Sequence, residues 1–202
     1  MRLWVVVFTY WCLVSPSVAD RCAAEDALAA VVRIQSDGEA SGVAIGPEMV
    51  VTAAHTVAPE NGIRIDAGGS MFDAEIVWID RQIDLAILKS QSPLFHTLPT
   101  HRDPVAPSAQ LWSIGYPLGG VKQMREGTLL GLYNGILLTS ASVDLGDSGG
   151  AIVGCESGEA VLFGIIRGIA RGRRWPSGND GLSGSVAIPA TEIRAALGQL
   201  NN

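Results

Sequence analysis

Short apolar runs separated by turn residues extend through most of the chain. Some alternate apolar and polar residues, as a strand with one buried face does, and others are apolar throughout, as in a strand buried on both faces. Gly and Pro mark turns between many of them. The runs expected to be strands are Val31–Ser36, Gly42–Gly46, Met49–Thr52, Ile63–Asp66, Ala74–Ile79, Leu85–Leu88, Leu111–Gly115, Gly127–Leu132, Ile136–Thr139, Ala151–Val153, Ala160–Ile169 and Ser185–Ile188. About a dozen short strands at this spacing predict an all-β sandwich or a pair of barrels.

Two segments are predicted to be helical. Residues 20–30 are acidic and rich in alanine, which is typical of a short lead-in helix. Near the other end, Thr191 can cap a helix that runs to about Leu200, with Leu197 and Leu200 on the same apolar side as Ile193. The segment after the last expected strand is too short for a second globular domain.

The first residues have the layout of a secretory signal peptide. Arg2 precedes an uncharged, mostly apolar run over residues 3–14, and small residues then lead to Ala19. We expect cleavage after Ala19, so that a signal peptide at 1–19 is removed from a domain at 20–202. The alternative is a retained membrane anchor, but the run is about half as long as a bilayer-spanning helix. The expected location is therefore periplasmic or extracellular, with no stable membrane anchor.

The composition excludes several other classes of protein. The chain is 48% hydrophobic and 17% charged, so it can bury a sizeable core and is not a disordered chain. Its net charge is −6 and no basic patch or stripe stands out, so no nucleic-acid partner is expected. Because no Cys or His spacing matches a metal site, we expect neither a metal nor a cofactor.

Cysteine usage fits an exported protein. Cys12 lies inside the predicted signal peptide, which leaves Cys22 and Cys155 as an even pair compatible with one disulfide. On the chain-entropy model, closing so long a loop would contribute about 4 kcal/mol to stability. The alternative is two separate thiols, because the sequence alone does not bring the two Cα atoms within bridging distance.

Three segments carry the residue types that acyl transfer requires. They are Thr52-Ala53-Ala54-His55, Asp84-Leu85-Ala86-Ile87-Leu88 and Gly146-Asp147-Ser148-Gly149-Gly150. A serine hydroxyl needs a neighbouring base to take its proton as it attacks, and a histidine suits that task near neutral pH. A carboxylate bonded to the other ring nitrogen fixes the tautomer of the histidine. The expected roles are Ser148 as nucleophile, His55 as general base and Asp84 as orienting carboxylate.

The glycines beside Ser148 suit an oxyanion hole. They permit a tight turn that presents the backbone N–H groups of Gly146 and Ser148 to one point. Each segment also has a simpler interpretation: a surface turn, a half-buried histidine, or an aspartate in a turn before a strand. Asp84, however, directly precedes an apolar run, so its carboxylate is expected to be partly buried and to need a partner.

Taken together, the three segments resemble those of trypsin-like (chymotrypsin-fold) serine peptidases in residue type, order and relative spacing. The resemblance covers nearly all of residues 31–189. It implies two perpendicular six-stranded β-barrels, with His55 and Asp84 from the first barrel, Ser148 from the second, and an oxyanion hole formed by Gly146 and Ser148. It also implies a secreted serine endopeptidase that hydrolyses peptide bonds of polypeptide substrates through an acyl-enzyme intermediate.

Within that family, the chain is most similar to bacterial Deg/HtrA-type protease domains, since it is compact, cysteine-poor and ends in Ser185–Pro189 followed by a helix. It differs from many of them by having Asp147 in place of Asn and by leaving no room for a PDZ domain. It differs from digestive members in lacking an Ile-Val-Gly-Gly-like segment, whose freed amine pairs with the acid beside the nucleophile. Asp147 is therefore expected to pair with a side chain such as an arginine.

The resemblance also implies a substrate pocket. The residues expected to form it are Ser142, Ile166, Arg167, Gly168 and Ala187. No acid stands at Ser142, which argues against a preference for Lys or Arg and favours a small-to-medium apolar side chain. For Arg167, the simpler expectation is an outward, solvated charge.

Two other classes of function are consistent with the same residues. The fold could serve an inactive binding or regulatory protein. An esterase or another acyl transferase could use the same triad, although the Gly-x-Ser-x-Gly elbow and the Ser–Asp–His order of α/β-hydrolases are missing.

His96 and His101 lie in a long connection and are expected to be solvated.

Overall fold

The computed structural model describes residues 24–58, 60, 62–102, 108–170 and 184–200. The predicted signal peptide and Cys22 lie outside the described residues. The elements, in chain order, are α1 (Ala24–Ala30), β1 (Val31–Gln35), β2 (Glu39–Ala44), β3 (Met49–Ala53), η2 (Ala54–Thr56), β4 (Ile63–Ala67), β5 (Ser70–Asp80), β6 (Leu85–Ser90), β7 (Gln110–Gly115), η4 (Pro117–Gly119), β8 (Gln123–Tyr133), β9 (Ile136–Thr139), β10 (Ala151–Glu156), β11 (Glu159–Ala170), β12 (Gly184–Pro189) and α2 (Ala190–Leu200). Each of the runs predicted as a strand falls on one of these strands.

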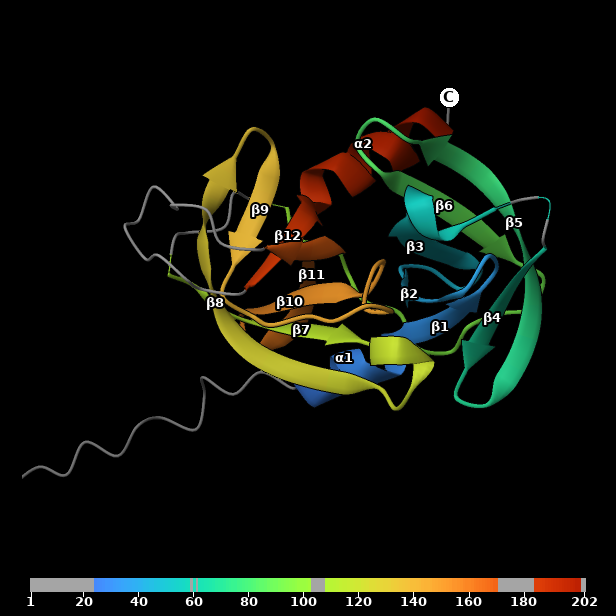
Figure 1. Ribbon diagram of the computed structural model, residues 1–202, viewed down its shortest axis with the longest axis horizontal. Coiled ribbons are helices and arrows are strands. Elements are labelled where there is room, and N and C mark those ends of the chain that lie inside the picture. The colour runs from blue at the N-terminus through green and yellow to red at the C-terminus, as the bar shows by residue number, and fades with distance from the viewer. Residues whose placement is uncertain (1–23, 59, 61, 103–107, 171–183, 201–202) are drawn as a thin grey trace, which may run out of the picture.

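The strands form two closed antiparallel barrels (Figure 1). The first has the order β1-β2-β3-β6-β5-β4, and the second has the order β10-β11-β12-β9-β8-β7. The predicted pair of six-stranded barrels is thereby confirmed. Closure leaves neither sheet with a free edge strand.

The burial pattern of each strand follows its place in the barrel. In β6, Leu85–Leu88 are buried throughout, because Leu85 and Ile87 pack against residues of the second barrel while Ala86 and Leu88 pack inside the first barrel. The longer strand β5 is mostly exposed or half-buried and carries a register shift between Ile76 and Trp78. Such an irregularity bends a strand, which lets one strand follow the curve of the barrel.

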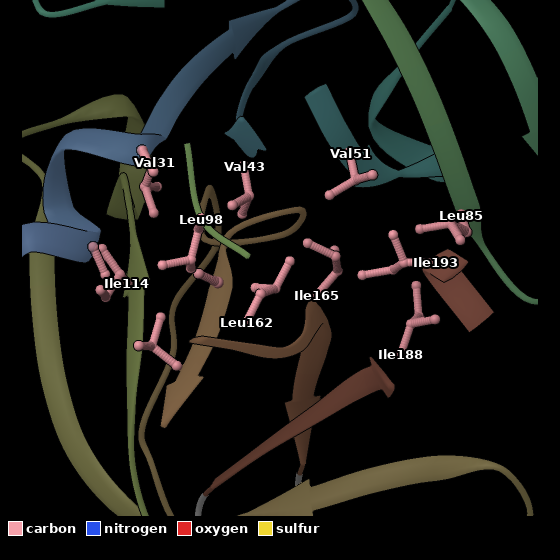
Figure 2. Packing of buried hydrophobic residues seen from close by; sticks show 14 of the residues in the cluster. Val31, Val43, Val51, Leu85, Leu98, Ile114, Leu162, Ile165, Ile188 and Ile193 are labelled. Carbon is pink, nitrogen blue, oxygen red and sulfur yellow. The ribbon is translucent and has the colours of Figure 1, made fainter. Parts of the chain in front are cut away.

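The two barrels share a hydrophobic core in addition to their own interiors. Figure 2 shows this shared core, where Val43, Val51 and Leu85 of the first barrel lie close to Leu162 and Ile165 of the second. These five side chains are fully buried. Burying a large aliphatic side chain contributes roughly 1.5–3 kcal/mol, so the core holds the two barrels as one unit. The segments that bear the site residues lie next to it.

Helix α2 closes the described chain. It begins at Ala190, directly after β12, so Thr191 lies inside the helix and the predicted cap at Thr191 is wrong. The reason is that no loop separates the strand from the helix. The predicted apolar side is confirmed, since Ile193 is buried in the shared core and Leu197 packs against it. No helix in the described part of the chain is long and apolar enough to cross a membrane.

Candidate active site

His55 lies where β3 ends and the short helix η2 begins. The backbone N–H of Ala54 donates to the Asp84 carbonyl at 2.9 Å, and the N–H of His55 donates to Asp84 Oδ1 at 2.9 Å. These two bonds fix the backbone from which the imidazole projects. The side chain is 49% exposed, so the ring is accessible from solvent.

Asp84 presents its carboxylate to the His55 ring. His55 Nδ1 lies 2.8 Å from Oδ2 and 3.0 Å from Oδ1. The residue is only 7% exposed, as its place before an apolar run predicts. Its φ of 65° is in the left-handed region, which Asp tolerates better than most side chains. Burial by itself would raise the pKa of Asp84, but hydrogen bonds from the His55 ring and backbone, together with the charges of His55 and Arg167, lower it.

Ser148 lies in the loop that precedes β10. It shares a surface hollow of about 290 Å³ with His55. The other residues that line the hollow are Asp37, Gly38, Glu39, Ala40, Thr56, Leu145 and Gly146. Next to the serine, Gly149 has a φ of 84°, and a Cβ there would lie 2.1 Å from both the Ser41 carbonyl oxygen and Thr52 Oγ1. Only glycine therefore fits at position 149, which allows the loop to approach the first barrel this closely.

Two backbone N–H groups of this loop point away from carbonyls that are hydrogen-bonded within the protein. The carbonyl of Leu145 accepts from the Leu118 N–H at 2.6 Å, and the carbonyl of Asp147 accepts from the Gly150 N–H at 2.8 Å. In a trans peptide the C=O and N–H point in opposite directions, so the N–H groups of Gly146 and Ser148 are left on the other side. In the described part of the chain, neither of these two N–H groups has a hydrogen-bond acceptor.

The acid beside the serine pairs with an arginine. Asp147 is fully buried, and its Oδ2 lies 2.7 Å from Arg125 Nη1 on β8. The same oxygen accepts from the backbone N–H of Asp144 at 2.8 Å, while Arg125 Nη2 lies 3.1 Å from Asp144 Oδ2. The expectation that an arginine replaces an N-terminal amine as the partner of Asp147 is confirmed for this structure.

Ser41 on β2 is a site residue that the sequence did not reveal. Its Oγ donates to the Gly146 carbonyl at 2.8 Å and accepts from the Tyr116 N–H at 2.9 Å. Its backbone N–H donates to the Ser148 carbonyl at 2.9 Å. A first-barrel strand thus holds the serine loop of the second barrel from both ends. The only signal in the sequence is a small polar residue inside an otherwise apolar run.

Arg167 does not have the outward, solvated position that the sequence favoured. It lies on β11 where the register with β12 shifts between Ile166 and Gly168. Its Nε is 3.4 Å from Asp84 Oδ2, and its side chain is 36% exposed. The shift in register changes which way the side chain faces, because side chains alternate sides only in a regular strand.

The other predicted pocket residues do not line the hollow that contains His55 and Ser148. Ile166 and Ala187 are buried in the core of the second barrel, whereas Ser142 is exposed. Gly168 pairs with Val186 in the sheet. None of these lines the hollow that contains His55 and Ser148 in the described part of the chain. Residues 171–183 lie outside the described residues, and the pocket stays a prediction.

The two remaining histidines, His96 and His101, differ in their exposure to solvent. His96 is exposed, as expected. His101 was expected to be solvated, which is wrong: its Nδ1 lies 3.0 Å from Glu156 Oε2, and its ring packs edge-on against Phe163 at 4.6 Å between centroids. Its neighbour Leu162 draws this part of the connection onto β11 through backbone bonds, which partly covers the ring.

Several known proteins are similar to this chain. The serine protease Rv3671c of Mycobacterium tuberculosis is 29% identical over 153 residues, which cover 68% of this chain and 38% of that protein. Serine protease HTRA1 of Xenopus tropicalis is 27% identical over 169 residues, which cover 76% of this chain and 34% of that protein. This chain thus spans about a third of the length of these relatives.

Solved structures agree on the fold. The inactive form of the Rv3671c protease superposes with a TM-score of 0.71 at 26% identity and covers 89% of this chain and 92% of that one. A serine endoprotease from Yersinia pestis gives a TM-score of 0.74 at 23% identity, with 88% of this chain and 65% of that chain covered. The family model described as a trypsin-like peptidase domain matches residues 40–165, which is more than half of the chain. By this match, the chain belongs to the trypsin-like peptidase family.

Proposed function

We propose that the protein is an exported serine endopeptidase that cuts polypeptides through an acyl-enzyme intermediate. Ser148 is the nucleophile, His55 the general base and Asp84 the orienting carboxylate. The observation that carries this proposal is the 2.8 Å contact between His55 Nδ1 and Asp84 Oδ2 beside a hollow that contains Ser148. The ion pair and the shared hollow support these roles, because the reaction needs a base that is oriented by a carboxylate and lies near the attacking hydroxyl.

The tautomer of His55 determines the direction of proton transfer. Because Asp84 carries a charge and accepts from Nδ1, the lone pair of the ring is on Nε2. That nitrogen takes the Ser148 proton as Oγ bonds to the scissile carbonyl carbon. The protonated ring then passes the proton to the leaving amine as the C–N bond breaks. A water repeats the two steps, which releases the acid and restores Ser148.

The loop around Ser148 supplies the donors for the charged intermediate. The N–H groups of Gly146 and Ser148 have no acceptor in the described structure, and both belong to residues that line the hollow. Pre-aligned N–H groups stabilise the oxygen that becomes negative during attack, and one lost donor costs roughly 2.7–4 kcal/mol. The buried Asp147–Arg125 pair and Ser41 hold this loop in place. In digestive members of the family, a freed N-terminal amine pairs with the acid beside the nucleophile instead.

We further propose a disulfide between Cys22 and Cys155, with cleavage of a signal peptide after Ala19. Helix α1 begins shortly after Cys22 and contacts β10, the strand that carries Cys155. An exported location favours such a bond. Peptide mapping of unreduced mature protein should find the two cysteine peptides joined. Recovery of both as separate peptides in unreduced protein would contradict the bond.

The experiment that tests the catalytic proposal is active-site labelling. A serine-directed phosphonate should modify purified protein at Ser148 in proportion to the loss of casein hydrolysis. The matched control is Ser148→Ala, which should neither label nor hydrolyse while melting at nearly the same temperature. Peptide binding without turnover in a folded, unlabelled protein would instead indicate a binding module.

A further inference from the structure

The Asp84 carboxylate is contacted from both barrels. His55, on the first barrel, lies 2.8 Å from Oδ2 through Nδ1, and Arg167, on the second barrel, lies 3.4 Å from the same oxygen through Nε. In the described part of the chain, Arg167 is the arginine or lysine that forms an ion pair with Asp84. One carboxylate oxygen therefore serves two basic groups.

The position of Arg167 is set by the loop that carries Ser148. The N–H of the preceding residue, Ile166, donates to the Gly150 carbonyl at 2.8 Å, and its carbonyl accepts from the Gly149 N–H at 2.7 Å. The following residue, Gly168, returns to the β12 ladder after the register shift. These bonds place the Arg167 backbone beside the serine loop, so its guanidinium reaches Asp84 across the boundary between the barrels.

We propose that Arg167 is a positioning residue that shares the Asp84 charge with His55 and thereby sets the acidic limit of activity. The inference rests on the proposed function and deepens it. A protonated imidazole needs the negative charge of Asp84 as its counterion, and a guanidinium at the same oxygen already uses part of it. The guanidinium also repels a second positive charge nearby. Without the guanidinium, the Asp84 charge would be left to His55 alone.

Other charged groups also lie around His55. Asp37 in the β1–β2 turn and Glu39 at the start of β2 line the same hollow, and Glu39 Oε2 lies 3.9 Å from Arg33 Nε. Arg81, in the turn before Asp84, donates from Nη1 to the Ala54 carbonyl at 3.3 Å. These groups are unchanged in an Arg167 variant, so a difference between variants isolates Arg167.

The test compares the acid limb of kcat/KM against pH for three proteins. As the pH is lowered, we expect kcat/KM of Arg167→Gln to fall to half its plateau value at a pH about half a unit or more above the pH at which wild type does so. Arg167→Lys keeps the charge and should restore most of the difference. Arg64→Gln, an exposed arginine on β4, removes the same charge elsewhere and should leave the limb in place. A limb that does not move in Arg167→Gln, or that moves equally in the Lys variant, would overturn the proposal.

A second measurement separates this inference from the proposed function. The His55 ring can be titrated by NMR in a Ser148→Ala background, where no turnover is needed, with His96→Gln and His101→Gln assigning the signals. Adding Arg167→Gln should move the His55 midpoint to higher pH by the same half unit or so. An unmoved midpoint refutes the role of Arg167 even in an active enzyme, and failed labelling of Ser148 refutes only the function. If the Gln variant does not fold, Arg167→Met keeps the aliphatic stem and serves the same comparison.

Discussion

Ser41 on the first barrel donates a hydrogen bond from its Oγ to the carbonyl of Gly146 on the second, over a distance of 2.8 Å. This bond orients the peptide that follows Gly146, and the backbone N–H of Ser41 fixes the Ser148 carbonyl at 2.9 Å. The position of the loop that carries Ser148 therefore depends on a side chain outside the proposed triad.

Removing that hydroxyl should weaken both catalysis and stability. Ser41→Ala leaves the buried Tyr116 N–H and the Gly146 carbonyl without their partner. We expect a loss of about 1–3 kcal/mol in the free energy of unfolding, measured in urea. We also expect kcat to fall roughly tenfold with KM little changed, since the proposed oxyanion donors at Gly146 and Ser148 lose alignment. Ser140→Ala, which removes a hydroxyl bonded to Thr128 on an exposed surface, is the control. Equal kcat in the two variants would contradict this role for Ser41.

The buried Asp147–Arg125 pair should be costly to break on one side. Arg125→Met leaves a fully buried carboxylate without its cation, which is expected to destabilise the protein by about 3–5 kcal/mol and to abolish most activity. Asp144→Asn, which changes the exposed acid that contacts the same guanidinium, should cost less than about 1 kcal/mol. Denaturant unfolding of both variants checks the contrast. A similar cost for the two would show that Asp147 does not need the charge.

Two glycines with nearly the same φ should respond differently to alanine. Gly149 has a φ of 84° and Gly158 a φ of 85°, but a Cβ at Gly149 would collide with the first barrel, whereas nothing lies within 4 Å of a Cβ at Gly158. Gly158→Ala therefore measures the backbone strain alone, about 1 kcal/mol. Gly149→Ala adds the collision and should also remove activity.

Thermal unfolding and casein hydrolysis of the two glycine variants provide the measurement. A Gly149→Ala protein that melts at the temperature of Gly158→Ala and stays active would show that the serine loop can move away from Ser41. The close approach of the serine loop to the first barrel would then not be required for stability or activity.

Asp84 should make stability depend on pH in the acidic range. Its pKa in the folded protein is lower than the ordinary value of 3.8, so the unfolded chain binds a proton more readily. The contribution of Asp84 is then fully present above about pH 5 and is lost as the pH falls through the folded pKa. Asp84→Asn should unfold with a flatter dependence on pH below 5 than wild type. Parallel curves for the two proteins would contradict the shift.

The sequence allowed a triad to be proposed because the three residues stand in short local motifs. His55 follows the end of an apolar strand, and Asp84 precedes another, so their places on the fold could be inferred from neighbouring residues. Their meeting follows from the pairing of β3 with β6, which sets Ala53 opposite Leu85. That register brings residues 54 and 84 together.

Long-range partners could not be predicted in the same way. An arginine partner for Asp147 was expected, but which arginine depends on how β8 lies against the serine loop, and no local pattern encodes that. The contact of Arg167 with Asp84 depends on a register shift in β11, which a run of apolar residues does not reveal. Ser41 was missed because its role exists only once the two barrels meet.

Because each sheet closes on itself, the catalytic residues of the proposed mechanism are divided between the two barrels, one in each half of the molecule. The base and its carboxylate belong to the half that ends before β7, and the nucleophile belongs to the other. A protein severed in the connection between the halves would be inert until the fragments found one another. Peptide hydrolysis would then measure how well the two fragments reassociate, and burial of the shared core shown in Figure 2 would drive that reassociation.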